Sequence, residues 1–242
     1  MKRLLIAAVA ALVGTGVALP SVGQSVDEVL DKHYEAIGGL EAWTSLQSMV
    51  ASGTLSVGGG MMQGPFRAYQ KRPAMSRLEF TIQGMNIVQA YDGITAWQIM
   101  PMAGSTEPVE ADPMTAATII EQSDMDGPLI GWREDGHSIE VAGTETIDGT
   151  EAIHLTVVVR GTTSQFYLDA NTYLPIQIKA EAMGMNTTTK MSDYRNVDGL
   201  LFPFLVEIDT EMGAQALIFD EVQINVAVDE SIFSMNPNAH RS

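Results

Sequence analysis

The stretch from Gly64 to Pro101 constrains the fold most, because four strand-like segments follow one another there with turn residues between them. The segments cover 66–72, 75–83, 86–91 and 94–100, and they are followed by Pro73, Gly84, Asp92-Gly93 and Pro101. Strands joined by so few residues can pair only as antiparallel neighbours, since a parallel return needs a crossover of about a dozen residues. The stretch therefore predicts one continuous antiparallel meander.

Strand-like segments on both sides extend this pattern to about twelve strands. One covers 48–57 and turns at Gly58-Gly59-Gly60 into a strand over 61–72. Seven more follow His137, over 138–144, 153–160, 165–169, 174–181, 186–194, 204–210 and 214–222. A sheet of this width twists too strongly to stay flat. We therefore predict a mainly β (α+β) fold, in which a curved antiparallel sheet forms an incomplete barrel covered by a few helices.

Two regions carry helical patterns that can cover such a sheet. Ser25 and Glu28 form a capping box, apolar residues then recur at helical spacing up to Leu40, and a short helical piece follows over 40–46. Asp112-Pro113 predicts the start of another helix, which ends near Ser123 and precedes a short helical or irregular piece over 129–133. We expect these helices to cover the apolar face and the second region to be mobile.

The first 23 residues have the pattern of a secretory signal. Lys2 and Arg3 precede an apolar run over 4–13, and small residues lead up to Gly23. We expect cleavage near Gly23 and a single domain over 24–242, located in the periplasm. The apolar run is too short to span a bilayer comfortably, so we do not expect an integral membrane protein. The absence of cysteine excludes disulfides, thiolate metal sites and an acylated cysteine anchor.

The formal net charge of −17 limits the partners of the chain. Its 30 acidic residues outnumber 13 basic ones, and such a surface repels phosphate groups. The charge therefore argues against nucleic-acid binding and against contact with an anionic membrane. Hydrophobic residues still make up 45% of the chain, so the charge does not indicate disorder.

Apolar and polar side chains alternate along several of the expected strands, which predicts one apolar face. In the strand over 75–83, for example, Leu78 and Phe80 share one side while Arg77 and Glu79 share the other. We expect the apolar sides together to form a trough that binds a ligand. Its expected lining consists of Leu78, Phe80, Ile82, Trp97, Ile153, Leu155, Val157, Phe166, Leu168, Leu217 and Phe219.

No group of residues in the sequence indicates catalysis. The four histidines, His33, His137, His154 and His240, lack the spacing of metal ligands, and no G-x-S-x-G motif is present. The three glycines at 58–60 lead into a strand, whereas a phosphate-binding loop needs a helix there. We therefore predict no catalytic residues, no metal and no cofactor. A hydrolase with an unlocated pair of acidic residues stays open as an alternative.

Methionine is unusually frequent, with 15 in the chain. Close pairs occur at Met61-Met62, at Met100 and Met102, and at Met183 and Met185. Thioethers bind soft metals, so a Cu(I) carrier is one alternative. The pairs are dispersed and no histidine accompanies them. An adaptable apolar cavity also favours flexible, polarizable side chains, and we prefer this interpretation.

Arg72 ends the strand that contains Phe66 and lies on the same side of it. Its guanidinium can therefore point toward the apolar face near the rim, where its five donors can bind carbonyl groups of a covering helix. This geometry predicts a latch that holds the covering helices on the sheet. An ordinary ion pair at the rim, for instance with Glu79, is the alternative.

Several short motifs resemble those of the outer-membrane lipoprotein-sorting (LolA/LolB-like) family. They are Lys71-Arg72-Pro73, then Arg77, the passage from Ile87-Val88 through Tyr91-Asp92-Gly93 and Trp97 to Pro101, and Asn225 to Asp229 with Phe233 and Pro237. The resemblance implies an incomplete barrel covered by helices, with an apolar cavity that receives acyl chains and with Arg72 bound to the cover. Gly38-Gly39 and the passage over 199–203 are more similar to an uncharacterised branch of the superfamily.

Together these features favour a non-enzymatic periplasmic carrier or chaperone that holds a lipid, or the acyl chains of a lipoprotein, in the trough. Each buried methylene would contribute about 0.8 kcal/mol to binding, so one long chain suffices for useful affinity. The alternative hypothesis is an envelope-stress sensor with the same fold, whose partner is an envelope membrane protein.

Overall fold

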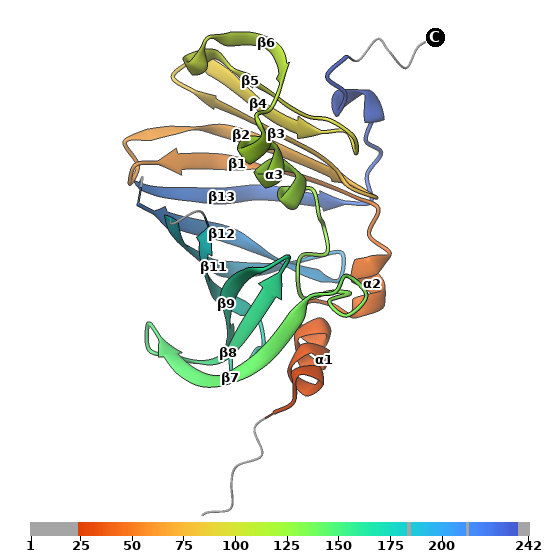
Figure 1. Ribbon diagram of the computed structural model, residues 1–242, viewed down its shortest axis with the longest axis vertical. Coiled ribbons are helices and arrows are strands. Elements are labelled where there is room, and N and C mark those ends of the chain that lie inside the picture. The colour runs from red at the N-terminus through yellow and green to blue at the C-terminus, as the bar shows by residue number, and fades with distance from the viewer. Residues whose placement is uncertain (1–23, 183–184, 212, 237–242) are drawn as a thin grey trace, which may run out of the picture.

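The computed structural model describes residues 24–182, 185–211 and 213–236, and its strands form one open antiparallel sheet (Figure 1). The order across the sheet is β6-β5-β4-β3-β2-β1-β13-β12-β11-β10-β9-β8-β7. The expected signal over 1–23, together with Met183, Pro237 and His240, lies outside the described residues. The strands are β1 (Ser48–Val57), β2 (Met62–Lys71), β3 (Met75–Ile82), β4 (Met85–Tyr91), β5 (Ala96–Met100), β6 (Ser105–Glu110), β7 (Ser138–Ile147), β8 (Thr150–Val159), β9 (Thr162–Asp169), β10 (Pro175–Ala182), β11 (Met185–Val197), β12 (Leu200–Thr210) and β13 (Gly213–Ile224).

The predicted fold class is confirmed. The 13-stranded sheet is curved and open, and its described part carries the helices α1 (Val26–Ala36), α2 (Leu40–Thr44) and α3 (Pro113–Gln122), with 3-10 turns η1 (Pro101–Ala103) and η2 (Glu230–Ile232). In Figure 1, α1 and α2 lie at the lower right and α3 lies in front of the upper strands. Adjacent strands of the sheet are consecutive in sequence except β1 and β13, whose pairing joins two meanders, while β6 and β7 lie at the two edges.

The meander between Gly64 and Pro101 forms as predicted, because its short turns fix the register of each pair. Lys71 pairs with Met75, and Ile82 pairs with Met85 across a two-residue turn. Only the start of β5 differs from the expectation. Asp92 Oδ1 accepts hydrogen bonds from the amides of Ile94 and Thr95, so these residues belong to the turn and the strand begins at Ala96.

The expected strand pattern misses one strand and places the start of another too late. β6 was not expected, because its sequence Ser105–Glu110 contains a proline and two glutamates, which are more typical of loops. β12 begins at Leu200 instead of Phe204, although Pro203 lies inside it. The segment before Leu205 pairs with β11 but not with β13, so Pro203 occupies a locally exposed edge where a missing amide donor is tolerated.

The helices begin where their capping residues predict. In the capping box of α1, Ser25 Oγ accepts from the Glu28 amide at 3.2 Å, and the Glu28 carboxylate accepts from the Ser25 amide at 2.9 Å. Asp112 caps α3 through the amides of Met114 and Thr115. Residues 129–133 form turns without a helix.

One face of the sheet, called here the inner face, carries most of the apolar side chains of the strands. Cross-strand pairs that share it include Phe66 with Phe80, Leu55 with Leu217, and Leu155 with Phe166. All three helices pack on this face. α1 packs on β8 and β9, and Trp43 of α2 and Leu46 after it pack on β12. In α3, the carbonyl oxygen of Gln122 accepts a hydrogen bond from Gln70 Nε2 of β2 at 2.7 Å.

Candidate ligand-binding face

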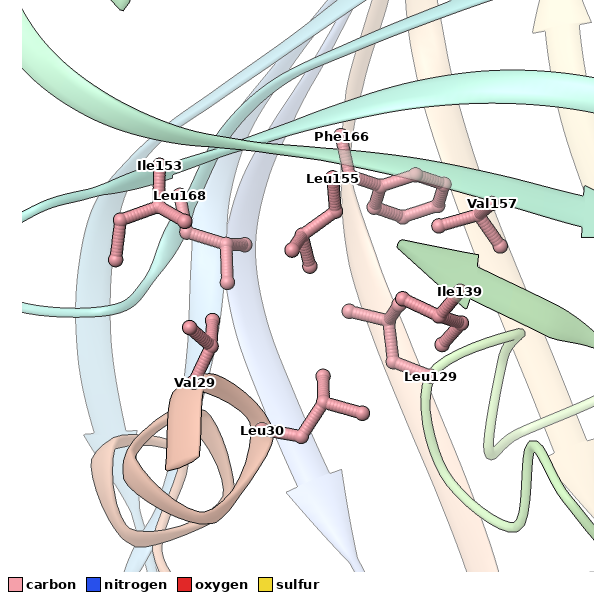
Figure 2. Close-up of a cluster of buried hydrophobic side chains, with 9 residues drawn as sticks. All are labelled: Val29, Leu30, Leu129, Ile139, Ile153, Leu155, Val157, Phe166 and Leu168. Carbon is pink, nitrogen blue, oxygen red and sulfur yellow. The ribbon is translucent and has the colours of Figure 1, made fainter. Parts of the chain in front are cut away.

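The part of the inner face formed by β7, β8 and β9 is filled by the protein's own side chains (Figure 2). Val29 and Leu30 of α1 and Leu129 of the following loop lie over it, and no residue of this cluster is more than 6% exposed. We call this part the packed section. It contains five of the residues expected to line the trough, and these can contact a ligand only if α1 leaves the sheet. They are Ile153, Leu155, Val157, Phe166 and Leu168.

A second part of the inner face, the open section, is built from strand residues of β13, β1, β2 and β3 alone. Leu55, Phe66 and Ile82 are buried in it, and the edge of the Phe66 ring meets Phe219 with ring centroids 5.2 Å apart. No helix side chain belongs to this cluster within the described ranges. The structure therefore leaves partly exposed four residues expected to line the trough: Leu78, Phe80, Leu217 and Phe219.

Between these two parts lies a section covered by α2 and by the loop after α3. Trp43 packs on Phe202 with ring centroids 5.2 Å apart, and Leu46 and Met125 are buried beside it. The Trp43 indole Nε1 donates to the Met125 carbonyl oxygen at 3.2 Å, which ties α2 to the loop. From β7 toward β3 the inner face thus changes from packed through covered to open, and α3 contacts the sheet again at β3, β4 and β5.

Trp97 lies on the opposite, outer face, so its expected place in the trough is wrong. It pairs with Ala90, which pairs with Arg77, and these three share the face opposite Leu78. Its Nε1 donates to the Phe233 carbonyl oxygen at 2.6 Å, so Trp97 binds the C-terminal segment to the outer face. The sequence pattern alone could not assign Trp97 to a face of the sheet, because the turn at Asp92 determines the register of β5.

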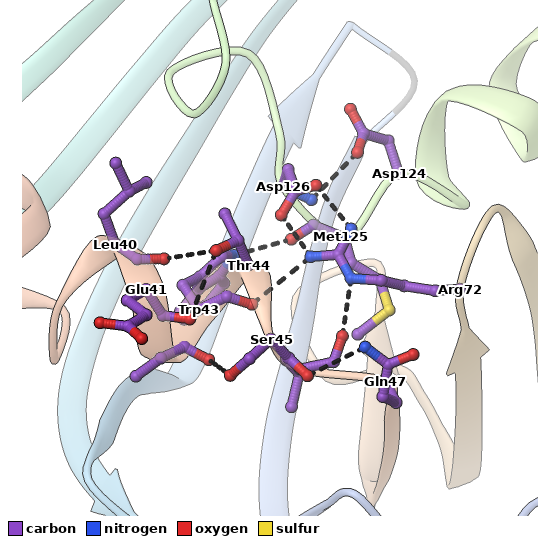
Figure 3. A network of polar contacts seen from close by, with 12 residues as sticks. Leu40, Glu41, Trp43, Thr44, Ser45, Gln47, Arg72, Asp124, Met125 and Asp126 are labelled. Atoms are coloured by element: carbon purple, nitrogen blue, oxygen red, sulfur yellow. Dashed lines mark hydrogen bonds and ion pairs between the residues drawn. The ribbon is translucent and has the colours of Figure 1, made fainter.

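Arg72 joins three segments that are distant in the sequence (Figure 3). Its Nη1 and Nη2 donate to the two carboxylate oxygens of Asp126 at 2.6 and 2.5 Å, and its Nε donates to the Leu46 carbonyl oxygen at 2.6 Å. The hydrogen bonds to Asp126 raise the pKa of Arg72, so the guanidinium stays charged. Glu79 binds Arg77 instead, so the alternative pairing of Arg72 with Glu79 is wrong.

The contacts of Arg72 belong to a wider attachment of the cover. The side chains of Arg72 and Asp126 are only 20% and 24% exposed, and a bidentate pair in such surroundings is stronger than an exposed one. The hydroxyl of Tyr34 in α1 donates to the Leu129 carbonyl oxygen at 2.6 Å. Both helices are therefore bound to the loop over 124–135, and Asp126 binds this loop to the end of β2. Asp126 could not be predicted, because the residues around it in the sequence do not indicate that its carboxylate binds Arg72.

The described histidines all contact the protein itself. His33 is buried in α1 with its Nδ1 3.0 Å from the Tyr173 carbonyl oxygen, and burial lowers its pKa. His137 Nδ1 lies 3.2 Å from the Pro128 carbonyl oxygen. His154 lies between Glu145 and Gln165, at 2.8 and 2.6 Å. No group of three or more His, Asp or Glu side chains in the described part of the chain could hold a metal ion.

Two surface pockets lie away from the open section. One of about 350 Å³ lies on the outer face beside Trp97 and Arg77, under the C-terminal segment. The other, of about 430 Å³, lies between α1, α2 and the loop after α3, and its lining is rich in carboxylates. Neither pocket includes a residue of the open section. Within the described ranges, no helix is long and apolar enough to cross a bilayer.

The fold is similar to that of several solved bacterial proteins, one of them a LolA superfamily protein. A LolA superfamily protein from Nitrosomonas europaea aligns with a TM-score of 0.59 at 12% identity, over 87% of this chain and 98% of that one. A DUF1329 family protein from Desulfovibrio piger aligns with a TM-score of 0.60, also at 12% identity and over 87% and 98% of the two chains. A domain assigned to outer membrane lipoprotein sorting from Vibrio parahaemolyticus aligns with a TM-score of 0.56 at 11% identity, over 87% of this chain and 96% of that one.

No protein-family model and no curated protein matches the chain. At 11–12% identity the structural matches establish the architecture, which this chain shares with these three proteins. The resemblance expected from the motifs around Arg72 and Trp97 is confirmed at this level. Cargo and partners do not follow from the fold itself.

Proposed function

We propose that this protein is a periplasmic carrier that binds an acyl chain of a lipid or lipoprotein on the open section of its inner face, without catalysing a reaction. The observation that carries the proposal is the contrast along one apolar face. The β7–β9 end is closed by α1, whereas Leu78, Phe80, Leu217 and Phe219 stay partly exposed in a cluster that includes no side chain from a described helix.

The chemistry of the open section fits an unbranched hydrocarbon chain. Its residues are aliphatic or phenyl side chains, which offer no hydrogen bonds and gain from contact with methylene groups in proportion to the area buried. At about 0.8 kcal/mol per methylene, eight to ten buried methylenes give roughly the free energy of a micromolar complex before ordering costs are subtracted. Specificity for a headgroup is not needed for binding of this kind.

The cover supplies a means of release. The loop over 124–135 binds α1 through Tyr34, α2 through Trp43 and β2 through the ion pair of Arg72 with Asp126. Breaking that ion pair would free the loop and α2 together, which would enlarge the open section toward Phe202 and Phe204. Arg72 therefore acts in this proposal as the latch of the cover.

The test uses two neighbouring residues of β13 that face opposite ways. Leu217 belongs to the open section, whereas Ile218 pairs with Thr54 and Leu205 on the outer face and is 43% exposed. Delipidated protein is titrated with a fluorescent fatty acid. We expect Leu217→Asp to weaken binding at least about tenfold, because a carboxylate at that position must be desolvated by the chain. Ile218→Asp should bind like the wild type.

Two outcomes would overturn the proposal. One is the lack of saturable binding by the wild-type protein, and the other is an equal loss of affinity in both variants. A stable protein partner from envelope extract, combined with no lipid extractable from the purified protein, would favour the envelope-stress sensor instead.

A further inference from the structure

The end of the open section that lies away from α1 and α2 carries exposed methionines. Met61 is 84% exposed in the β1–β2 turn and Met102 is 61% exposed in η1, while Met62 and Met185 are exposed at the starts of β2 and β11. We call these four residues, with Met85 at the start of β4, the methionine rim. In Figure 1 the β1–β2 turn lies at the left, opposite α1 and α2.

Strand register places these methionines next to the open section. Met62 pairs with Val57, which packs on the open section, and Met85 pairs with Ile82, which is buried in it. η1 contacts β4, so Met102 lies at the same end. On the other side, the pairing of Thr187 with Thr210 brings the start of β11 beside the β12–β13 turn. An apolar surface therefore continues from the open section to this end of the sheet.

The backbone of the β1–β2 turn holds Met61 out from the sheet. Gly58, Gly59 and Gly60 have φ values of 64°, 65° and 95°, a run of left-handed conformations that side chains with a Cβ disfavour. Gly58 still donates its amide to the Ala214 carbonyl oxygen at 2.7 Å, which anchors the base of the turn on β13. Met61 then follows at the tip with little cover.

The segments that form the rim contain no charged residue. Residues 42–66, 80–91, 93–106 and 182–189 lack Asp, Glu, Lys and Arg, although the chain has 30 acidic and 13 basic residues. Glu211 of the β12–β13 turn, 3.5 Å from Asn186 Nδ2, lies at the same end, so the uncharged apolar tips are those of the β1–β2 turn, the start of β4 and η1. A surface of this kind can approach a neutral partner without desolvating a charge and without electrostatic attraction.

We infer that the methionine rim docks on a lipid bilayer whose headgroups carry no net charge. Methionine side chains are flexible and can enter the disordered region between headgroups and acyl chains. The inference rests on the proposed function for the next step, in which a lipid chain passes over Met62 and Met85 into the open section. The docking step itself depends only on the rim.

The experiment measures flotation of the protein with phosphatidylcholine vesicles that contain no other lipid. The test variant carries Met61→Ser and Met102→Ser together. The matched control is Ile94→Ser, since Ile94 is 89% exposed in the β4–β5 turn, at the end of the strands away from the rim. Each methionine side chain that leaves water increases partitioning onto the vesicles by up to about tenfold. We therefore expect the double variant to partition at least about tenfold more weakly than the wild type. The control should stay within about twofold of the wild type.

Two results would overturn the docking inference: wild-type protein that does not float, or an Ile94→Ser loss as large as that of the double variant. A second measurement separates it from the proposed function. Binding of the fluorescent fatty acid without vesicles should be the same in the wild type and the double variant, because both retain the open section. If the probe binds but the protein does not float, the docking inference is refuted and the carrier function is retained. If the protein floats but the probe does not bind, the carrier function is refuted and the docking inference is retained.

Discussion

Asp126 and Arg72 form the contact on which the attachment of the cover depends most directly. Replacing Asp126 by Asn keeps the shape of the side chain but removes the charge that faces a guanidinium with 20% side-chain exposure. We expect Asp126→Asn to reduce the free energy of unfolding by about 1–3 kcal/mol. Amide hydrogen exchange should become faster in α2 and in residues 124–135, whose carbonyl and carboxylate groups bind Arg72, but not in β8 and β9.

The pair Lys190–Asp148 provides the control for this prediction. It has a similar distance of 2.7 Å, but its side chains are 39% and 72% exposed, and exposed pairs contribute little. Asp148→Asn should therefore leave hydrogen exchange in α2 unchanged. Equal effects of the two substitutions would show that Asp126 acts through the total charge of the protein, and the latch assigned to Arg72 would have to be abandoned.

His33 makes stability depend on pH at a single position. Burial lowers its pKa below the ordinary value of 6.5, despite the opposing hydrogen bond to the Tyr173 carbonyl oxygen. The unfolded chain then binds this proton more readily than the folded protein. The contribution of neutral His33 is therefore present above about pH 6.5 and is lost as the pH falls toward the folded pKa.

Urea unfolding of the wild type and of His33→Gln measures this effect. Between about pH 7.5 and about pH 5, the wild type should lose more stability than the variant, because glutamine can bind the carbonyl group without titrating. Carboxylates contribute equally to both proteins and cancel in the difference. Parallel pH profiles would contradict the assignment of a lowered pKa to His33.

At the scale of elements, α1 closes the packed section of the inner face. Leu30 is 1% exposed and packs with Val29 over β8 and β9. Leu30→Ala should lower the free energy of unfolding by about 2–5 kcal/mol through lost contacts and a cavity. Affinity for the fluorescent fatty acid should change less than about twofold, since the open section contains no residue of α1. A large change in affinity would instead place part of the binding site under α1.

Local turn chemistry made many elements predictable from the sequence. Gly84, Asp92-Gly93 and the capping box at Ser25 act over a few residues, so they fix the hairpins and the start of α1 without knowledge of the rest of the chain. β6 was missed because its strand character comes from pairing with β5, which outweighs Pro108. Edge strands of this composition have no clear local signal.

The candidate site was predictable only in part, because alternation shows which residues share a face but not what covers them. The apolar side of β8 and β9 was identified, yet its five residues are closed by α1. Phe80 and Leu217 have the same pattern in sequence and remain partly exposed. The difference depends on where the helices pack, which is a contact between distant segments. Arg72 was singled out as a latch, whereas Asp126 required the structure.

At the scale of the whole molecule, one sheet presents surfaces of different character in succession. α1 closes the β7–β9 end, α2 and the loop over 124–135 cover the middle, and the open section leads to the uncharged methionine rim. The paired strands β1 and β13 lie near the middle of the sheet and join the two meanders. In the proposed function, an acyl chain would bind on the open section and would enter or leave over the methionine rim.

The net charge of −17 should decide which bilayers the rim can reach. The rim is uncharged, but at about 0.01 M salt electrostatic forces extend roughly 30 Å, far enough for the acidic body of the protein to be repelled by an anionic surface. Replacing about one third of the phosphatidylcholine by phosphatidylglycerol should therefore reduce flotation several-fold at low salt. At about 0.15 M salt the range falls to roughly 8 Å, and flotation should recover toward the value for neutral vesicles. Stronger binding to anionic vesicles at low salt would mean that basic residues, and not the methionines at 61 and 102, make the contact.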